Sequence, residues 1–301
     1  MSEFKEKVVV ITGGGGGIGK AAAARFLDEG ASVVLSSRRL EALEAASREL
    51  DADDRIALAP GDVSSPTAAA ELIDIAVDRF GGVDVLVNST GIFRVTPFLD
   101  QTEAEFEEAL DSILRPTFYT SQAAARTMVE RGRGAIINVG SMWALDAITT
   151  TPTSAYSAAQ AGRHALTKNL ALELAPEGIR VNTVALAFVE TPAYERFMTA
   201  EQARDVLESV NAFHPLGRHG YPADVVEAIL FLAGDRAGWI TGTTLPIDGG
   251  VLAGRSAPPA SVRDESPSFR GISRPRAIIS RRPSPSTPAP PVPSANSHSS
   301  T

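Results

Sequence analysis

A glycine run over residues 12–19, Thr-Gly-Gly-Gly-Gly-Gly-Ile-Gly, has the composition of a phosphate-binding turn. An apolar β-branched run precedes it at 8–11, and an alanine-rich helical pattern follows it at 20–27. Glycine lets the backbone approach a pyrophosphate, and the start of the next helix points unpaired N–H groups at it. A flexible linker is the alternative, but linkers rarely separate a buried strand from such a helix. The run therefore predicts a dinucleotide site.

Two arginines at the end of the second predicted strand bear on the choice of dinucleotide. The segment reads Ser-Ser-Arg-Arg over 36–39 and lacks the acid that NAD-selective folds place about 20 residues beyond the glycines. A guanidinium suits a 2′-phosphate, so Ser37 and Arg38 predict NADP (NADPH). The alternative is that both arginines are ordinary solvated residues, although a basic helix start opposes the helix dipole.

The pattern T-G-x-x-x-G-I-G, formed by Thr12, Gly13, Gly17, Ile18 and Gly19, resembles the short-chain dehydrogenase/reductase family. The resemblance extends to about residue 251 and implies further cofactor contacts. These lie at Asp62, Val63, Asn88, Gly91, Val189 and Thr191. An alternative role for the aspartate is to cap the helix after residue 64.

The resemblance also implies an acid–base pair made of Ser141 and Tyr156. In the family the serine binds the substrate oxygen, and the tyrosine passes a proton while hydride moves. A family lysine four residues after the tyrosine lowers its pKa and holds the nicotinamide ribose. Gln160 stands there instead and carries no charge, and Ile113 stands where the family keeps a water-holding asparagine. The alternatives are a strand-end hydrogen bond for the serine and a surface ring for the tyrosine.

Large apolar side chains predict a pocket beside the nicotinamide, under a lid at 190–215 as in the family. They are Phe93, Trp143, Tyr194, Phe197, Met198 and Phe213. If they line a pocket, the small-molecule substrate has a sizeable apolar body. The alternative is that several of them are core residues, which helical spacing does not exclude.

Apolar strands alternate with helical patterns through the first 254 residues. This predicts a single doubly wound α/β domain of the Rossmann type, with a parallel sheet covered on both faces. The expected strands are 7–12, 32–37, 55–59, 83–88, 134–140, 180–185 and 243–246. The expected helices are 17–29, 40–50, 65–80, 102–112, 117–131, 154–175 and 222–233.

Residues 255–301 are rich in Pro, Ser and Arg and predict a disordered tail. Seven arginines against two acids give this tail a charge of +5, so residues 1–254 carry −13 of the total of −8. The acidic domain argues against nucleic-acid binding. The tail is either a docking segment or a solvated appendage without a selected role.

Composition narrows the location and the chemistry further. The chain has no cysteine, so a disulfide or a thiolate metal site is impossible, and no metal site is expected. Without a signal peptide or an apolar stretch of about 20 residues, a cytoplasmic protein with no membrane contact is expected.

These observations lead to an NADP-dependent oxidoreductase acting on a ketone or secondary alcohol. The resemblance implies a homo-oligomer, a tetramer or dimer, built on helices 117–131 and 154–175. Gln160 and Ile113 keep two alternatives open: a cofactor-binding protein with an impaired site, and a redox-neutral isomerase or dehydratase.

Overall fold

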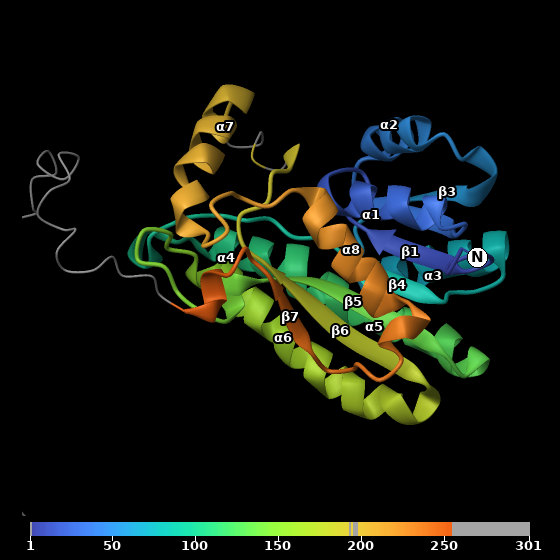
Figure 1. The fold of residues 1–301 in the computed structure, drawn as a ribbon. Coiled ribbons are helices and arrows are strands. Elements are labelled where there is room, and N and C mark those ends of the chain that lie inside the picture. The colour runs from blue at the N-terminus through green and yellow to red at the C-terminus, as the bar shows by residue number, and fades with distance from the viewer. Residues whose placement is uncertain (1, 193, 195–197, 255–301) are drawn as a thin grey trace, which may run out of the picture. The chain divides into compact units, whose positions relative to one another are not determined.

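Seven parallel strands form one sheet in this computed structural model, which describes residues 2–192, 194 and 198–254. The order is β3-β2-β1-β4-β5-β6-β7, so the direction of winding reverses between β1 and β4 (Figure 1). The bounds are β1 Val8–Thr12, β2 Ser32–Ser37, β3 Ile56–Pro60, β4 Val85–Asn88, β5 Gly134–Ser141, β6 Ile179–Leu186 and β7 Thr244–Ile247. The predicted doubly wound, Rossmann-like α/β fold is confirmed.

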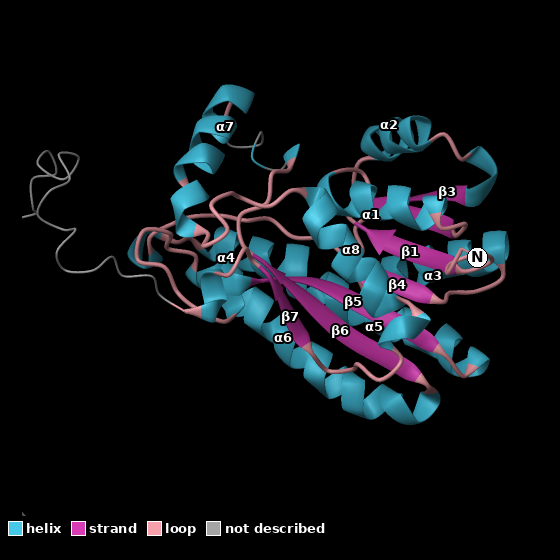
Figure 2. Cartoon of the chain, in the orientation of Figure 1, coloured by secondary structure: helices cyan, strands magenta, loops and turns pink. Residues whose placement is uncertain are grey.

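Helices cover both faces of this sheet (Figure 2). Helices α1, α2 and α8 pack on one face, and α3, α5 and α6 pack on the other. The bounds are α1 Gly17–Asp28, α2 Leu40–Leu50, α3 Pro66–Phe80, α4 Glu103–Ala109, α5 Arg115–Arg131, α6 Ser154–Leu174, α7 Ala200–Ser209 and α8 Pro222–Ala233. Each helix that follows a strand returns the chain to the amino edge of the sheet, so the strands' carboxyl ends meet at one edge.

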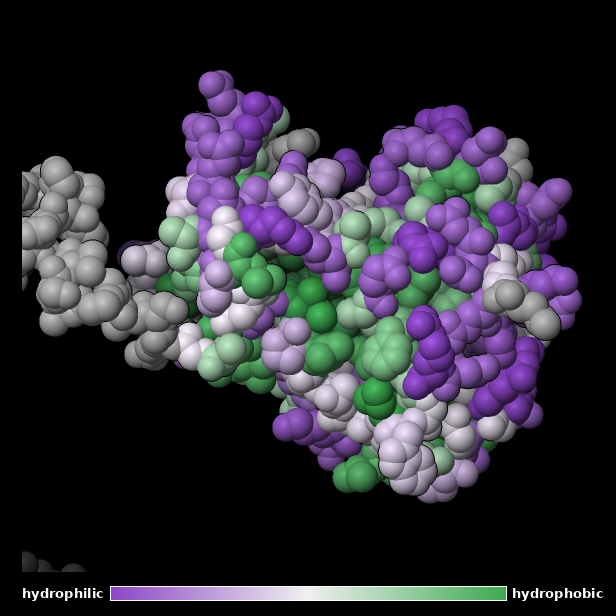
Figure 3. All heavy atoms as spheres, in the orientation of Figure 1, coloured by the Kyte–Doolittle hydropathy of each residue, from purple (hydrophilic) through white to green (hydrophobic). Residues whose placement is uncertain are grey.

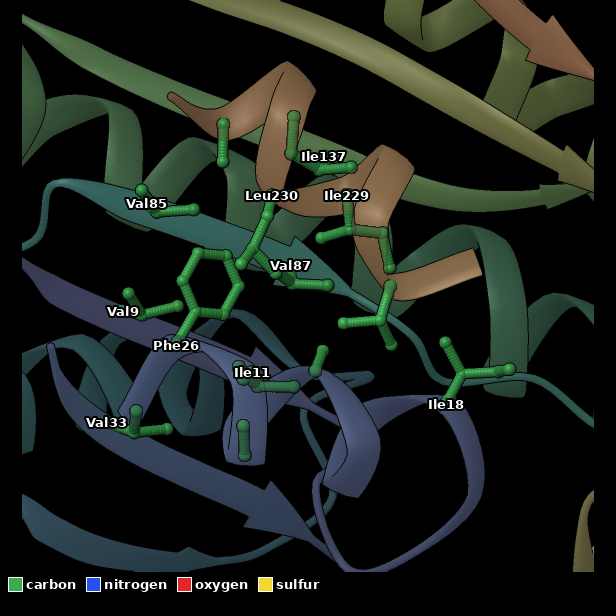
Figure 4. Close-up of a cluster of buried hydrophobic side chains, with 14 of the residues drawn as sticks. Val9, Ile11, Ile18, Phe26, Val33, Val85, Val87, Ile137, Ile229 and Leu230 are labelled. Carbon is green, nitrogen blue, oxygen red and sulfur yellow. The ribbon is translucent and has the colours of Figure 1, made fainter. Parts of the chain in front are cut away.

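The core consists of two apolar layers, one on each face of the sheet. Strand side chains alternate between them: Val9 and Ile11 join α1 and α8, whereas Val8 and Val10 join α3 and α5. Figure 4 shows the first layer, in which Phe26 of α1 lies among strand valines and the leucine and isoleucine side chains of α8. Because β1 is buried on both faces, its position and that of the turn after it are strongly fixed.

Helices α4 and α5 differ in one respect from expectation. The predicted gap between 112 and 117 is filled by a π-helical turn, Leu110–Leu114, so the helical path is continuous. Pro116 follows this turn and has no N–H to donate to the carbonyl of Ser112, which favours a widened turn at this place. The carbonyl of Ile113, which lies in this turn, accepts from the Thr117 hydroxyl and from the guanidinium of Arg163.

The surface on the face drawn in Figure 3 carries hydrophilic residues over α7 and α2, with apolar residues between them. Within the described ranges, no helix is long and apolar enough to cross a membrane. The predicted tail at 255–301 lies outside the described residues.

Candidate active site

A cleft of about 710 Å³ opens at the carboxyl ends of the strands. Its walls come from the turn after β1, the ends of β2, β3 and β5, the loop after β4, the start of α6 and the segment after β6. The reversal of strand order between β1 and β4 lies at its centre. In open α/β sheets this reversal is where ligands bind.

The glycine turn leaves room for a phosphate above the start of α1. Gly13 has φ +73°, and a Cβ there would lie 2.8 Å from the carbonyl oxygen of Ser89. A Cβ on Gly19 would overlap the carbonyl oxygen of Gly13, so α1 packs directly against the turn. Gly16, the N-cap of α1, has open space where its Cβ would be. The residues of this turn therefore suit the pyrophosphate of a dinucleotide.

The end of β2 presents positive charge to the cleft. Arg38 and Arg39 line it with exposed side chains, and neither makes a side-chain hydrogen bond or ion pair with any residue that the structure describes. The Ser37 hydroxyl donates to the carbonyl of Arg39 at 3.0 Å, which orders the turn between them. Both guanidinium groups are therefore available to an anion.

Asp62 and Val63 follow β3 and also line the cleft. The Asp62 carboxylate accepts from the N–H of Ser64 at 3.0 Å. Ser65 is the N-cap of α3 and accepts from the N–H of Ala68 at 3.2 Å. The helix cap is thus the serine, and Asp62 instead forms the turn that faces the cleft.

Tyr156, Ser141 and Gln160 meet at the far end of the cleft. The Gln160 side-chain amide donates to the Tyr156 hydroxyl at 3.1 Å, and the Ser141 hydroxyl accepts from the N–H of Trp143 at 3.3 Å. Burial raises the pKa of Tyr156 above its ordinary value of 10, and hydrogen bonds from Ser141 and Gln160 oppose that rise. The phenol is therefore protonated at neutral pH and can act as a proton donor.

Four buried polar atoms around the cleft have no hydrogen-bond partner among the described residues. They are Thr90 Oγ1, Ser112 Oγ, Trp143 Nε1 and Gln160 Oε1. An unpaired buried polar atom costs about 1–3 kcal/mol, so a ligand that pairs with them recovers that free energy. The sequence patterns did not reveal Thr90 and Ser112, because their role depends on which side chains the fold leaves facing the cleft.

Two consecutive residues of α6, also missed by the sequence patterns, support the reacting end. Arg163 is buried and lines the cleft. His164 Nε2 accepts from the backbone N–H of Ser141 at 3.3 Å, which holds the strand end in place. Burial, and then the charges of Arg163 and Lys168, lower the pKa of His164 to about 4. His164 therefore stays neutral and keeps its acceptor nitrogen at physiological pH.

A seam of buried hydrogen bonds, formed by Asn88, Asn138, Thr167 and Thr183, runs beneath the cleft. Asn88 donates to Asn138 at 2.9 Å, Asn138 donates to Thr167 at 2.8 Å, and the two threonine hydroxyls lie 2.7 Å apart. The seam ties β4, β5, β6 and α6 together. Asn88, predicted as a cofactor contact, thus lies below the surface of the cleft and is not among its lining residues.

Aromatic rings gather beside Tyr156. The ring of Phe93 lies 5.0 Å from that of Tyr156 and 5.1 Å from that of Trp143, centroid to centroid. Tyr194 also lines the cleft, and burial raises the pKa of its phenol. Phe213 packs in the same cluster without lining the cleft.

Most of the predicted site residues come together in this one cleft. The lining includes Gly13, Gly17, Ile18, Ser37, Arg38, Asp62, Val63, Gly91, Phe93, Ser141, Trp143, Tyr156, Gln160, Val189, Thr191 and Tyr194. Gly19 and Asn88 lie behind the lining, Met198 is not part of it, and Phe197 is outside the described residues.

Comparison with known proteins extends these observations. A family model described as enoyl-(acyl carrier protein) reductase matches residues 14–252. The chain is 37% identical over 249 residues to a 3α-hydroxysteroid dehydrogenase of Mediterraneibacter gnavus, covering 81% of this chain and 96% of that protein. It is 34% identical over 253 residues to a 3-oxoacyl-acyl-carrier-protein reductase of Thermotoga maritima, covering 82% of this chain and 98% of that protein.

Solved structures resemble the chain equally well. A short-chain type dehydrogenase/reductase from Mycobacterium marinum has a TM-score of 0.78 at 32% identity, covering 84% of this chain and 98% of that one. A structure described as ElxO with NADP bound has a TM-score of 0.77 at 30% identity, covering 82% of this chain and 99% of that one. The chain therefore belongs to the short-chain dehydrogenase/reductase family and is an oxidoreductase of that type.

Proposed function

We propose that this chain is an NADP-dependent oxidoreductase that interconverts a ketone and a secondary alcohol by hydride transfer. The observation that carries the proposal is the position of the protonated Tyr156 phenol, in the same cleft as the glycine turn. Relatives named as a hydroxysteroid dehydrogenase and an oxoacyl reductase support this reaction class.

The choice of NADP rests on charge at the end of β2. Arg38 is exposed at the cleft and is not engaged by any acidic residue of the described chain. A guanidinium binds a phosphate through two charge-assisted hydrogen bonds, whereas the free 2′-hydroxyl of NAD would leave it unused. The NADP-bound relative supports the same choice.

The protein's own groups would handle the oxygen of the substrate. Bound NADPH supplies the hydride that forms the new C–H bond at the carbonyl carbon. As the π-electron pair moves to the carbonyl oxygen, Tyr156 donates its proton to that oxygen and Ser141 orients the oxygen with a hydrogen bond. The unpaired Gln160 Oε1 is free to accept from a ribose hydroxyl. The oxidation direction reverses each of these transfers.

The substrate we infer has a bulky apolar body. Phe93, Trp143 and Tyr194 form an aromatic wall next to the reacting phenol. Aromatic walls favour rings and branched alkyl groups because they bury large apolar areas with little loss of side-chain entropy.

Three observations favour a second candidate. By the family resemblance, neutral Gln160 stands at the position of the lysine and Ile113 at that of the asparagine, and burial raises the pKa of Tyr156. A tyrosine that ionises with difficulty suits either a cofactor-binding protein with an impaired site or a redox-neutral isomerase or dehydratase. Losing a tuned acid–base group typically slows a reaction about 10²–10⁴-fold.

We also propose a homo-oligomer, dimer or tetramer, built on α5 and α6. Phe118 on α5 is 46% exposed and Leu172 on α6 is 80% exposed. Large exposed apolar side chains on neighbouring helices favour burial against a second copy. Light scattering should give a mass of two or four chains, and a monomer at tens of micromolar would exclude this assembly.

The activity test begins with binding. The purified full chain is titrated with NADPH and with NADH by fluorescence, and bulky ketones are then screened for NADPH oxidation. Tyr156→Phe and Ser141→Ala should each lower kcat about 10²-fold or more with little change in NADPH affinity. The matched control Tyr119→Phe, in α5 and away from the cleft, should retain full activity. Tight NADPH binding without any turnover would support the second candidate instead.

A further inference from the structure

Arg163 is a buried guanidinium without a carboxylate partner among the residues that the structure describes. Its side chain is 1% exposed and makes no ion pair with any residue in the described ranges. Every one of its partners is neutral. Nε donates to Thr117 Oγ1 at 2.8 Å, and the terminal nitrogens donate to the carbonyls of Val139, Thr90 at 2.7 Å and Ile113 at 3.0 Å. Buried arginines usually have a counter-charge, so this arrangement needs an explanation.

The position of Arg163 relates it directly to the reacting phenol. Tyr156, Gln160 and Arg163 are spaced by four and three residues along α6, so they share one face of the helix. Side chains of a helix lean toward its N-terminus, and the long arginine therefore reaches back toward the phenol. All three residues line the same cleft.

The acceptors of Arg163 fix its guanidinium at the base of that cleft. They belong to the end of β5, the loop after β4 and the π-helical turn, which are three separate elements. The carbonyl of Ile113 belongs to the π-helical turn and also accepts from the Thr117 hydroxyl. A side chain held from three directions cannot swing away when charge develops nearby.

Neutral partners leave the charge of Arg163 uncompensated. Burial lowers its pKa to about 10, so the group is still charged at neutral pH. The titratable groups that interact with it are Tyr156 and His164 on α6, and Tyr194 from the segment after β6 interacts in turn with Tyr156. None of the three side chains is anionic at that pH. Asp111 also lines the cleft, but its carboxylate pairs with Arg115. The phenolate of Tyr156 is thus the one anion among these groups that the reaction would create next to Arg163.

We propose that Arg163 supplies the positive charge that stabilises the Tyr156 phenolate when the phenol gives up its proton, a role that neutral Gln160 does not fill. The proposal rests on the proposed function for its context. In that reaction the tyrosine O–H bond breaks, an O–H bond forms on the substrate oxygen, and hydride from NADPH reduces the carbonyl carbon. Arg163 would act through Tyr156 and is therefore a positioning residue. The competing explanation is that Arg163 has only a structural role, in which its guanidinium links three backbone carbonyls by hydrogen bonds.

A spectroscopic titration separates charge from structure. 3,5-Difluorotyrosine, whose phenol ionises at lower pH than tyrosine, is incorporated at position 156 of the full chain, and its ¹⁹F signal is followed against pH without cofactor. Arg163→Gln should raise the midpoint by about one pH unit or more, since a nearby opposite charge shifts a pKa by about 1–3 units. Arg163→Lys should raise it by less. The matched control Lys168→Gln, an exposed charge on the same helix, should leave it within 0.3 unit, roughly the precision of such a titration.

Chemical rescue covers the case in which Arg163→Gln does not fold. Arg163→Ala opens a space of guanidinium shape, and methylguanidinium and methylurea have the same shape and similar hydrogen bonds but differ in charge. Both should restore the melting temperature, whereas methylguanidinium alone should restore the midpoint of the label. An equal effect of methylurea on the midpoint, or an unshifted midpoint in folded Arg163→Gln, would overturn the proposal.

The titration also distinguishes this proposal from the proposed function. A shifted midpoint together with no turnover on any ketone would retain the role of Arg163 and reject the oxidoreductase reaction. If Arg163→Gln still reduces a ketone and the midpoint is unshifted, the role of Arg163 is rejected and the oxidoreductase reaction is retained.

Discussion

Gly19→Ala tests whether the start of α1 packs against the glycine turn as the structure has it. A Cβ at this position would overlap the backbone carbonyl oxygen of Gly13, and a backbone atom cannot move aside as a flexible side chain can. Such overpacking costs about 1–3 kcal/mol. Alanine recovers up to about 1 kcal/mol of that cost through its higher helix propensity. Because the overlapping atom belongs to the backbone, the cost lies in the upper part of that range, about 2–3 kcal/mol, and the expected net loss of unfolding free energy is about 1–2 kcal/mol.

Thermal and urea unfolding, followed by circular dichroism, measure this loss. For a domain of this size, 1–2 kcal/mol corresponds to a fall in Tm of about 2–8 °C. The matched control is Gly16→Ala, whose Cβ would enter open space in the cleft and whose φ of 175° any residue adopts. It should change stability by less than about 0.5 kcal/mol while weakening NADPH binding, because its methyl occupies the space inferred for phosphate. A Gly19→Ala chain as stable as the wild type would refute the close packing.

Three further outcomes are expected. Arg38→Asp should reverse the preference from NADPH to NADH, as measured by fluorescence titration, and an unchanged ratio would remove Arg38 from the phosphate site. Asp84→Asn should cost about 1–2 kcal/mol in urea unfolding, since this buried carboxylate accepts from the N–H of Val8 at 3.0 Å and faces three basic side chains. His164 is neutral in the folded protein with a pKa of about 4, against 6.5 ordinarily, so the unfolded chain binds the proton first as pH falls. Stability should therefore drop by about 2 kcal/mol between pH 8 and pH 5, and His164→Gln should flatten that slope. If the wild type and His164→Gln lose stability equally between pH 8 and pH 5, His164 is not the group responsible.

Local patterns predicted the parts of the site that depend on neighbouring residues. The glycine turn follows from a strand, a turn and a helix that are consecutive in sequence, and Gly13 adopts the positive φ that glycine permits. Ser141 and Tyr156 were placed by family resemblance, and the fold brings both to one cleft.

The remaining features depend on contacts between distant segments. In the sequence Arg163 is indistinguishable from other helical arginines, because its acceptors come from three elements that are distant in sequence. Asn88 matches a family position at the cleft, yet its amide turns down to meet Asn138, fifty residues away in sequence. Neither a spacing rule nor a composition rule contains the geometry of these contacts, so the sequence predicted the location of the site better than its internal electrostatics.

The seam of Asn88, Asn138, Thr167 and Thr183 has a consequence for redesign of this protein. Replacing any one member by an apolar residue strands a neighbour's donor or acceptor in the dry interior, at about 1–3 kcal/mol for each orphaned atom. Directed evolution toward new ketones should therefore leave these four positions untouched and collect its changes in the aromatic wall above them. Substitutions in the buried seam therefore destabilise the protein, whereas substitutions in the aromatic wall are tolerated.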